Sequence, residues 1–209
     1  MVIGRPSNTT CYDWISLVEG VKKRAKKNSI VLEIGSSVPE RTHMLVPYCR
    51  RIIGVEYFSD RIPKNFANVR YVHGDWQKLT RVISRNSVDV AVRNQVIEHV
   101  EKDVQALDEL YAVLKPGGVA LLSTPNRTRA LQKISDLLKG RERTFPWGEH
   151  VREYTIEDAV SLVKKSRFRK YDIVPLVLGI HTGPFYCYLE KPPSFFARYA
   201  NFLEFRLYK

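Results

Sequence analysis

Short apolar runs rich in β-branched residues recur along the chain, and polar or helical stretches separate them. The runs occupy residues 29–35, 51–56, 69–75, 88–92 and 119–123. Runs that are this short and almost entirely apolar are typical of strands buried on both faces. Strands that alternate with helices predict a parallel sheet joined by right-handed crossovers. We therefore predict a doubly wound α/β fold with helices on both faces of a mostly parallel sheet.

Later segments extend this pattern. Strands are expected at 170–178 and 186–190, which brings the predicted sheet to seven strands. The spacing of apolar residues also predicts helices, at 12–27, 102–115, 129–138 and 156–165.

The C-terminus has an aromatic pattern of its own. Apolar residues at i, i+4, i+7 and i+8 predict a terminal amphipathic helix whose aromatic face is formed by Phe195, Tyr199, Phe202 and Leu203. The expected organisation is an N-terminal helix (1–28), a central domain (29–190) and this C-terminal aromatic helix (191–209). Within the central domain, an insertion at about 127–152 would cover a bound substrate.

Charge and apolar content limit the kinds of partner. The chain has 34 Lys and Arg against 22 Asp and Glu, a formal net charge of +12. Such a field attracts nucleic acid, acidic membrane surfaces or anionic small molecules. No run reaches the ~18 apolar residues of a membrane span, and residues 1–10 lack the apolar stretch of a secretory signal. A cytoplasmic monomer or homodimer is expected, with peripheral membrane contact through 194–209 as an alternative.

Polar residues follow the predicted strands, at the edge where parallel α/β sheets bind ligands. After the first strand, Glu33 precedes Gly35, which permits a sharp turn, and the hydroxyls of Ser36 and Ser37 can bond to a ligand. The next strand ends at Glu56, beside Tyr57, and a carboxylate at this position can accept both hydroxyls of a ribose.

The third and fourth strand ends carry further candidates. Asp75, after Gly74, can accept a hydrogen bond from an adenine amino group, and Trp76 can stack on the ring. Asp75 could equally cap the next helix. After the fourth strand, Gln95, Glu98 and His99 are spaced to share one face of a helix.

The ordered segments resemble those of class I S-adenosylmethionine (SAM)-dependent methyltransferases, particularly the branch of quinone-head and other small-molecule methyltransferases. The resemblance runs from about Ser29 to Phe168. It is carried, in the family's order, by residues 31–35, 54–56, 74–75, 94–100, 114–126 and 150–155. It implies a Rossmann-like sheet and SAM as cofactor. It also implies that Glu33 and Gly35 hold the methionine end, Glu56 the ribose, and Asp75 with Trp76 the adenine.

The resemblance also implies that the backbone at Arg93 and Asn94 faces the sulfonium. Two departures from the family pattern bear on this. Ser37 and Pro39 replace further glycines of the first motif, and proline removes a backbone donor. Arg93 replaces a residue that is usually small and polar, so an anionic acceptor is a hypothesis.

Methyl transfer from a sulfonium is an in-line displacement, and holding the two reactants in line supplies much of its acceleration. A general base is needed only when the acceptor keeps its proton. The candidate bases are His99 and His150, although either can instead have a packing role. Some quinone-directed relatives hold a divalent metal at this segment, but Gln95 replaces one acid here, so no metal is expected.

The acceptor atom, O, N or C, is left open, on a small and anionic or lipid-linked molecule. A nucleic-acid or protein methyltransferase is an alternative, which the basic runs favour. Against a nucleic-acid role, the chain lacks an Asp/Asn-Pro-Pro-Tyr tetrapeptide after the fourth strand. A methyltransferase-like partner subunit without catalysis is the third alternative, which the altered first motif favours.

Overall fold

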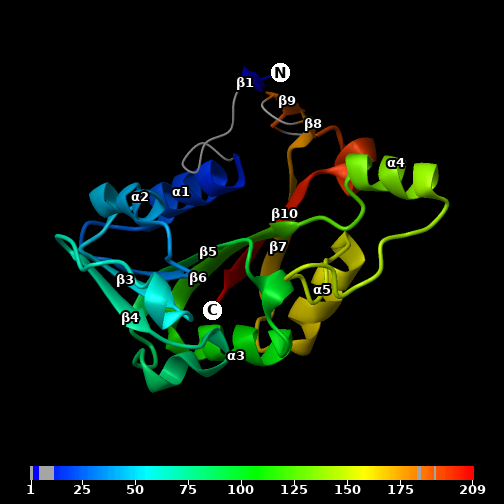
Figure 1. Ribbon diagram of the computed structural model, residues 1–209. Coiled ribbons are helices and arrows are strands. Elements are labelled where there is room, and N and C mark those ends of the chain that lie inside the picture. The colour runs from blue at the N-terminus through cyan, green and yellow to red at the C-terminus, as the bar shows by residue number, and fades with distance from the viewer. Residues whose placement is uncertain (1, 5–11, 183–184, 191) are drawn as a thin grey trace.

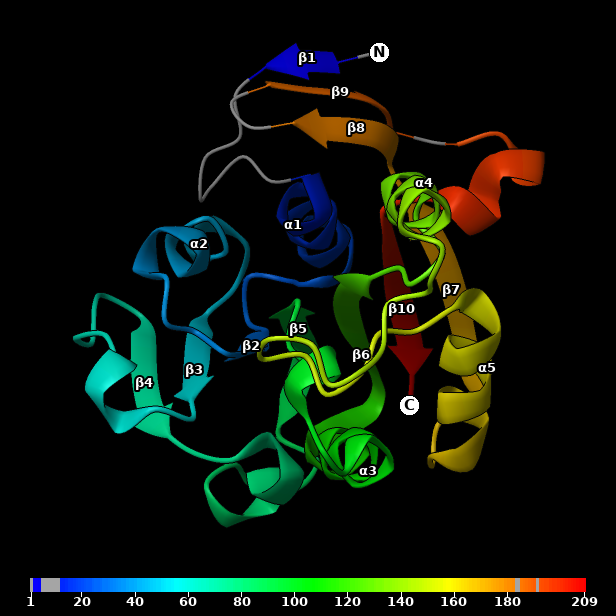
Figure 2. The same ribbon diagram turned by 45° about the vertical axis from the view of Figure 1, so that its right-hand side comes forward.

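A computed structural model describes residues 2–4, 12–182, 185–190 and 192–209. Within these ranges the chain forms a seven-stranded sheet with helices on both faces (Figures 1 and 2). From one edge to the other, its strands are β4 (Val69–His73), β3 (Arg51–Glu56), β2 (Ile30–Ile34), β5 (Val88–Asn94), β6 (Leu114–Pro125), β10 (Phe202–Tyr208) and β7 (Lys170–Leu176). The five strands from β4 to β6 are parallel to one another, and β10 is antiparallel to both of its neighbours. The predicted α/β fold with a mostly parallel, seven-stranded sheet is confirmed.

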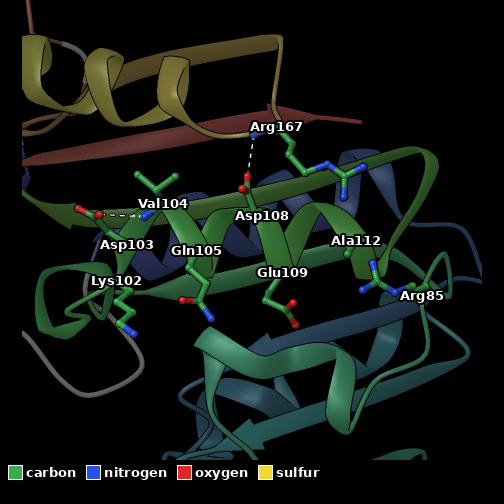
Figure 3. A pocket seen from close by; sticks show the side chains of 9 residues that line it. All are labelled: Arg85, Lys102, Asp103, Val104, Gln105, Asp108, Glu109, Ala112 and Arg167. Atoms are coloured by element: carbon green, nitrogen blue, oxygen red, sulfur yellow. Dashed lines mark hydrogen bonds between the residues drawn. The ribbon is translucent and has the colours of Figure 1, made fainter.

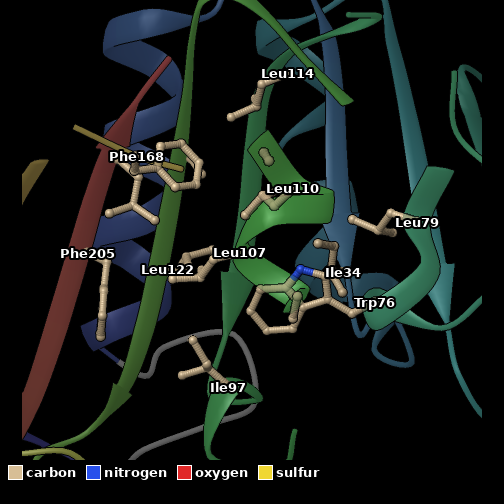
Figure 4. Close-up of a cluster of buried hydrophobic side chains, with 14 of the residues drawn as sticks. Ile34, Trp76, Leu79, Ile97, Leu107, Leu110, Leu114, Leu122, Phe168 and Phe205 are labelled. Atoms are coloured by element: carbon tan, nitrogen blue, oxygen red, sulfur yellow. The ribbon is translucent and has the colours of Figure 1, made fainter. Parts of the chain in front are cut away.

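The sheet separates two apolar layers. On one face, α1 (Tyr12–Arg24) buries Trp14 and Leu17 against the sheet, and α2 (Pro39–His43) lies beside it (Figure 1). On the other face, α3 (Asp103–Val113) and α5 (Ile156–Lys165) pack against the strands. Figure 4 shows this second layer, in which Leu107 and Leu110 of α3 lie near Trp76. Both faces are covered, as the near-continuous apolar strands predict.

Short helices and one longer helix complete the described structure. The 3-10 turns are η1 (Val46–Tyr48), η2 (Ser59–Arg61), η3 (Trp76–Arg81), η4 (Ile97–His99) and η5 (Ser194–Tyr199). Helix α4 (Ala130–Lys139) lies within the predicted covering insertion, and α5 begins with a capping box between Thr155 and Asp158. In the described part of the chain, no helix is long and apolar enough to cross a bilayer.

The predicted C-terminal amphipathic helix is wrong. Residues 194–199 form the 3-10 turn η5, and residues 202–208 form strand β10 in the interior of the sheet, between β6 and β7. The physical reason is that apolar residues recur here at every second position, which is the period of a β-strand. Leu203, Phe205 and Leu207 are fully buried and alternate with more polar residues. This strand makes the C-terminal segment part of the core, so the boundary expected at residue 190 does not separate it from the domain.

The strand expected at 186–190 exists, but it lies outside the main sheet. It is β9 (Phe185–Leu189), which pairs with β1 (Val2–Gly4) and β8 (Leu178–Thr182) in a three-stranded antiparallel sheet. The strand expected at 170–178 is interrupted at Val177, whose φ of 62° breaks the extended backbone between β7 and β8. Residues 1 and 5–11 of the expected N-terminal segment lie outside the described residues.

Candidate functional site

The carboxyl ends of four parallel strands bring the predicted site residues to one edge of the sheet. Strand register places Ile34 opposite Val55 on one side and Arg93 on the other, and places Glu56 opposite His73. The residues that follow these strands therefore share one region, as expected for an open parallel sheet. The grouping of these segments is confirmed, whereas their individual roles remain predictions.

A cavity of about 260 Å³ opens at this edge between the first and fourth strand ends. Glu33 and Gly35 line one side, Asn94 and Gln95 line the other, and Trp14 of α1 completes it. Among the described side chains, Glu33 Oε2 and Trp14 Nε1 are buried polar atoms without a hydrogen-bond partner. Such orphaned atoms need an explanation, and a polar ligand supplies one.

Glu33 has an unusual electrostatic environment. Its side chain is 4% exposed, and burial raises the pKa of its carboxyl to about 7. Near neutral pH its protonated and ionised forms are therefore both populated. It can hold a cationic or hydrogen-bonding group in its ionised form.

Gly35 is required by its backbone conformation. Its φ is +74°, and a Cβ there would lie 3.1 Å from Val96 Cγ2 and 3.5 Å from an Arg93 nitrogen. Only glycine adopts this conformation without strain. The first motif therefore keeps its essential turn, although Ser37 and Pro39 follow it.

Glu56 ends β3 as a buried carboxylate. It is 4% exposed, and its Oε1 accepts a hydrogen bond from the backbone N–H of Phe58 at 3.1 Å. The neighbouring Tyr57 is 60% exposed, and its carbonyl contacts His73 Nε2 at 2.8 Å. This pattern fixes the direction of the carboxylate.

The structure shows the capping alternative at Asp75. Its Oδ1 accepts from the backbone N–H of Gln77 at 2.8 Å, which caps η3. Trp76 is 3% exposed and packs into the core near Ile34 and Leu107 (Figure 4). A face of its ring is occupied by the Arg93 guanidinium, 4.2 Å from the ring centroid. In this conformation the indole is not an open platform for adenine.

Arg93 is a buried cation at the end of β5. It is 3% exposed, and burial lowers its pKa well below the ordinary value, while the carboxyls of Glu98 and Glu56 oppose that shift. Its Nε has no partner among the described residues. Because the guanidinium is enclosed beside the cofactor region, the structure does not present it to an anionic acceptor in solution.

The prediction that Gln95, Glu98 and His99 share one face of a helix is wrong. Gln95 has a φ of +48°, and only Ile97–His99 forms a 3-10 turn. The backbone therefore turns between Gln95 and His99, and the two side chains leave in different directions. Gln95 Nε2 donates to Asp13 Oδ2 at 2.5 Å, while His99 Nδ1 contacts the Glu149 carbonyl at 2.7 Å. The expected shared helical face does not form.

The structure instead brings His99 next to His150. Their ring centroids are 4.8 Å apart with an edge-to-face geometry, and His150 Nδ1 contacts Glu153 Oε1 at 3.1 Å. Both Nδ1 atoms face oxygen acceptors, which leaves each Nε2 to accept a proton. Burial lowers the pKa of His99 from its ordinary 6.5. The two candidate bases, separated by 50 residues in sequence, form one pair.

Glu98 lies beneath this pair. It is fully buried, its Oε2 accepts from Thr124 Oγ1 at 3.0 Å, and burial raises its pKa to about 7. Ligand atoms of Glu98, His99 and His150 lie within 4.8 Å of one another and could hold a divalent cation. The expectation that no metal is needed stays a prediction.

Sequence reasoning missed two residues that organise this region. Asp13 of α1 is fully buried and receives the Gln95 amide. Glu153 is 3% exposed and accepts two bonds from Arg129, at 2.6 and 3.1 Å, as well as contacting His150. A carboxylate three residues after a histidine was the available signal for Glu153, whereas nothing local marks Asp13.

A larger hollow, of about 570 Å³, lies on α3 and not at this edge (Figure 3). Its lining is mostly polar and charged, with Gln105 and Glu109 along the helix and Arg85 and Arg167 at one end. Asp108 accepts there from the backbone N–H of Arg167 at 2.7 Å. We interpret it as a solvated groove between α3 and its neighbours.

Comparison with known proteins defines the family. Residues 32–122, which run from the middle of β2 through β3, β4 and β5 into β6, match the methyltransferase domain family. A Mycolicibacterium smegmatis protein named "probable S-adenosylmethionine-dependent methyltransferase" is 37% identical over 157 residues. Residues 32–122 are therefore a methyltransferase domain. The alignment covers 73% of this chain and 55% of that relative.

Two further comparisons agree with this family. A mitochondrial ubiquinone biosynthesis O-methyltransferase of Dictyostelium discoideum is 32% identical over 98 residues, which cover 44% of this chain and 30% of that protein. The chain therefore spans about a third to a half of the length of these relatives. The crystal structure of a SAM-dependent methyltransferase from Thermotoga maritima has a TM-score of 0.63 at 22% identity, covering 95% of this chain and 89% of that one. This last likeness shows the fold.

The methyltransferase domain has polar groups at this edge that suit SAM. Orphaned polar atoms at Glu33 and Trp14 line the cavity beside Gly35, and the buried carboxylate of Glu56 lies at the next strand end. An amino-acid moiety and a ribose each need hydrogen-bonding partners of this kind. The residues present therefore fit the family's cofactor, provided that the Arg93 side chain yields part of the space over Trp76.

Proposed function

We propose that this domain transfers a methyl group from SAM to a hydroxyl oxygen of a small molecule. The observation that carries the proposal is the His99–His150 pair, which the fold assembles beside the cofactor edge with both Nε2 atoms able to accept a proton. A base is needed for an acceptor that keeps its proton at neutral pH, as a hydroxyl does. The similarity to an O-methyltransferase of ubiquinone biosynthesis supports an oxygen acceptor.

Three strand ends would hold the cofactor. Glu33 and the turn at Gly35 would bind the methionine end, Glu56 would accept the ribose hydroxyls, and the segment at Asp75 would border the adenine. Bound SAM supplies an electrophilic methyl group on a sulfonium. The chain contributes position, since the cavity is lined by the buried side chains of Trp14, Glu33 and Ile34.

His99 would act as the base. Its lowered pKa keeps the imidazole neutral near pH 7, and the Glu149 carbonyl holds Nδ1, so Nε2 receives the acceptor's proton as its oxygen takes the methyl group. His150 lies next in the path and is oriented by Glu153, so it can pass the proton towards solvent. An anionic or lipid-linked acceptor remains within this proposal, and the enclosed position of Arg93 favours the uncharged hydroxyl as the reacting group.

Cofactor binding is the first test. Calorimetry with S-adenosylhomocysteine should show binding to the wild type, and Glu56→Ala should weaken it about 10- to 100-fold, because the site then loses a charge-assisted contact to the ribose hydroxyls. Glu101→Gln, an exposed carboxylate on the loop after η4, is the matched control and should bind like the wild type.

The same preparation separates the alternatives. A wild type that binds neither SAM nor S-adenosylhomocysteine would contradict the proposal and support a partner subunit without catalysis. Methylation of RNA or protein in place of small hydroxyl compounds would support the nucleic-acid or protein alternative. Activity lost on chelation and restored by a divalent cation would move the function of Glu98, His99 and His150 from base to metal ligand.

A further inference from the structure

Helix α4 is amphipathic, but its apolar side faces outward. Ile134 is 53% exposed, and Leu137 and Leu138 are each 82% exposed. The buried residue of this helix is a polar one, Gln132. A helix that covers a sheet normally buries its apolar side, so this orientation leaves the face most expensive to hydrate in contact with water.

Specific contacts hold α4 in this orientation. Just before its N-terminus, Arg129 binds the buried Glu153 carboxylate in a bidentate pair. Within the helix, Gln132 Nε2 donates to Asp136 Oδ1 on the side that faces the protein. At its C-terminus, Gly140 ends the helix in the left-handed conformation, with a φ of 63°. The pair with Glu153 therefore anchors the N-terminal end of α4 to the domain.

The 3-10 turn η5 extends this face. Phe195 and Phe196 are 71% and 44% exposed, and η5 lies beside α4 in both views of the chain (Figures 1 and 2). The carbonyl of Arg198 in η5 accepts from Asn126 Nδ2 at 3.0 Å and from Thr128 Oγ1 at 2.5 Å, which ties η5 to the segment that leads into α4. We treat the five exposed apolar residues of these two neighbouring elements as one candidate surface, the α4–η5 face: Ile134, Leu137, Leu138, Phe195 and Phe196.

Positive charge surrounds the α4–η5 face. Lys139 and Arg141 are exposed at the end of α4, and Arg198 lies in η5, whereas Lys133 is paired with Glu142 at 2.8 Å. The whole chain carries +12. A second copy of the chain would bring the same charge to the contact, but an anionic bilayer would attract it. Exposed leucine and phenylalanine bordered by Lys and Arg are the composition of an interfacial membrane helix.

We propose that the α4–η5 face docks on the surface of an anionic lipid bilayer. The apolar side chains enter the boundary between head groups and acyl chains, while Lys139, Arg141 and Arg198 contact the lipid phosphates. This docking is independent of the proposed methyl transfer.

Vesicle co-sedimentation tests the docking. The full chain should pellet with vesicles of phosphatidylcholine and phosphatidylglycerol, and binding should decrease as salt rises, because attraction between Lys or Arg and lipid phosphates is screened. Binding to vesicles of phosphatidylcholine alone should be at least tenfold weaker. The double variant Leu137→Glu/Leu138→Glu should lose at least tenfold of the binding, because it puts carboxylates against anionic lipid.

Phe66→Glu is the matched control, since Phe66 is 51% exposed at the β4 edge of the sheet and outside the α4–η5 face. It should pellet like the wild type, and circular dichroism should show all variants folded. Two results would overturn docking: a wild type that pellets with neither vesicle, or a dimer in sedimentation velocity that the double variant dissociates while no vesicle binding occurs. The second result would identify another copy of the chain as the occupant.

Discussion

Replacing His99 with Ala is expected to lower kcat about 100- to 10,000-fold, the range that loss of a positioned general base produces. The affinity for S-adenosylhomocysteine should stay within about threefold, because the imidazole contacts the Glu149 carbonyl and His150 and does not line the cavity beside Gly35. Steady-state kinetics with a hydroxyl acceptor, together with calorimetry, measures both quantities.

The pH profile gives this prediction its sign. His99 acts as a base only when neutral, and burial lowers its pKa below the usual 6.5. Wild-type kcat should therefore be constant near neutral pH and fall as pH decreases through that lowered value, while the His99→Ala profile should lack this limb. His43→Ala is the control, because His43 is exposed on α2, packs against the Phe66 ring and does not line the cavity. A variant that keeps full kcat would assign His99 a packing role.

Replacing Glu33 with Gln is expected to make the ligand-free protein more stable at alkaline pH. Burial raises the pKa of Glu33 from 4.5 to about 7, so above pH 7 the folded protein carries a carboxylate that is poorly solvated. That difference in pKa corresponds to about 3 kcal/mol, an upper value for the gain in the free energy of unfolding. Urea unfolding at pH 8.5 and at pH 4.5 measures it.

The sign follows from proton binding. With a folded pKa above the unfolded one, the native state binds the proton more tightly, so this contribution to stability is complete below pH 4.5 and is lost as pH rises towards 7. A glutamine at this position does not ionise, so it causes no such loss of stability. The free energies of unfolding of the wild type and of Glu33→Gln should therefore be similar at pH 4.5. The exposed control Glu101→Gln should change stability by less than about 0.5 kcal/mol at both pH values. An equal effect of Glu33→Gln at pH 4.5 and 8.5 would show that its carboxyl is not buried in this way.

Stability gained by Glu33→Gln should come at the expense of cofactor affinity. The Oε2 atom that lacks a partner in the ligand-free chain lies in the cavity that would hold the methionine end of SAM. A residue that is suited to ligand binding commonly makes the protein less stable than another residue at the same position would. Weaker binding of S-adenosylhomocysteine together with greater stability would support this interpretation.

The position of the site at the carboxyl ends of the strands could be predicted from the local sequence. The short runs that end at Gly35, Glu56 and Asp75 are apolar enough to be buried strands, and parallel pairing necessarily brings their carboxyl ends together. Asp75 shows the limit of such patterns, because helix capping and adenine binding require the same residue type at the same place.

Other features depend on contacts between distant segments. His99 and His150 meet because the chain at 150–152 returns to η4, where the backbone N–H of Val151 donates to the Glu98 carbonyl at 2.9 Å. The contact between the Trp76 ring and Arg93 also depends on the tertiary structure. Trp76 follows β4 and Arg93 lies in β5, and in the sheet β3 and β2 lie between these two strands. The spacing of residues in the sequence predicts neither contact.

The sequence by itself determined the α/β class, the positions of the buried strands and the set of polar residues at their carboxyl ends, because burial and parallel pairing act through periodicity that is written locally. The tertiary structure alone decided that the aromatic C-terminus is a strand, that Gln95 and His99 diverge, and that α4 turns its leucines outward. The physical reason is that an exposed or buried face is defined by what packs against it, and for 202–208 and α4 those neighbours lie far away in the chain.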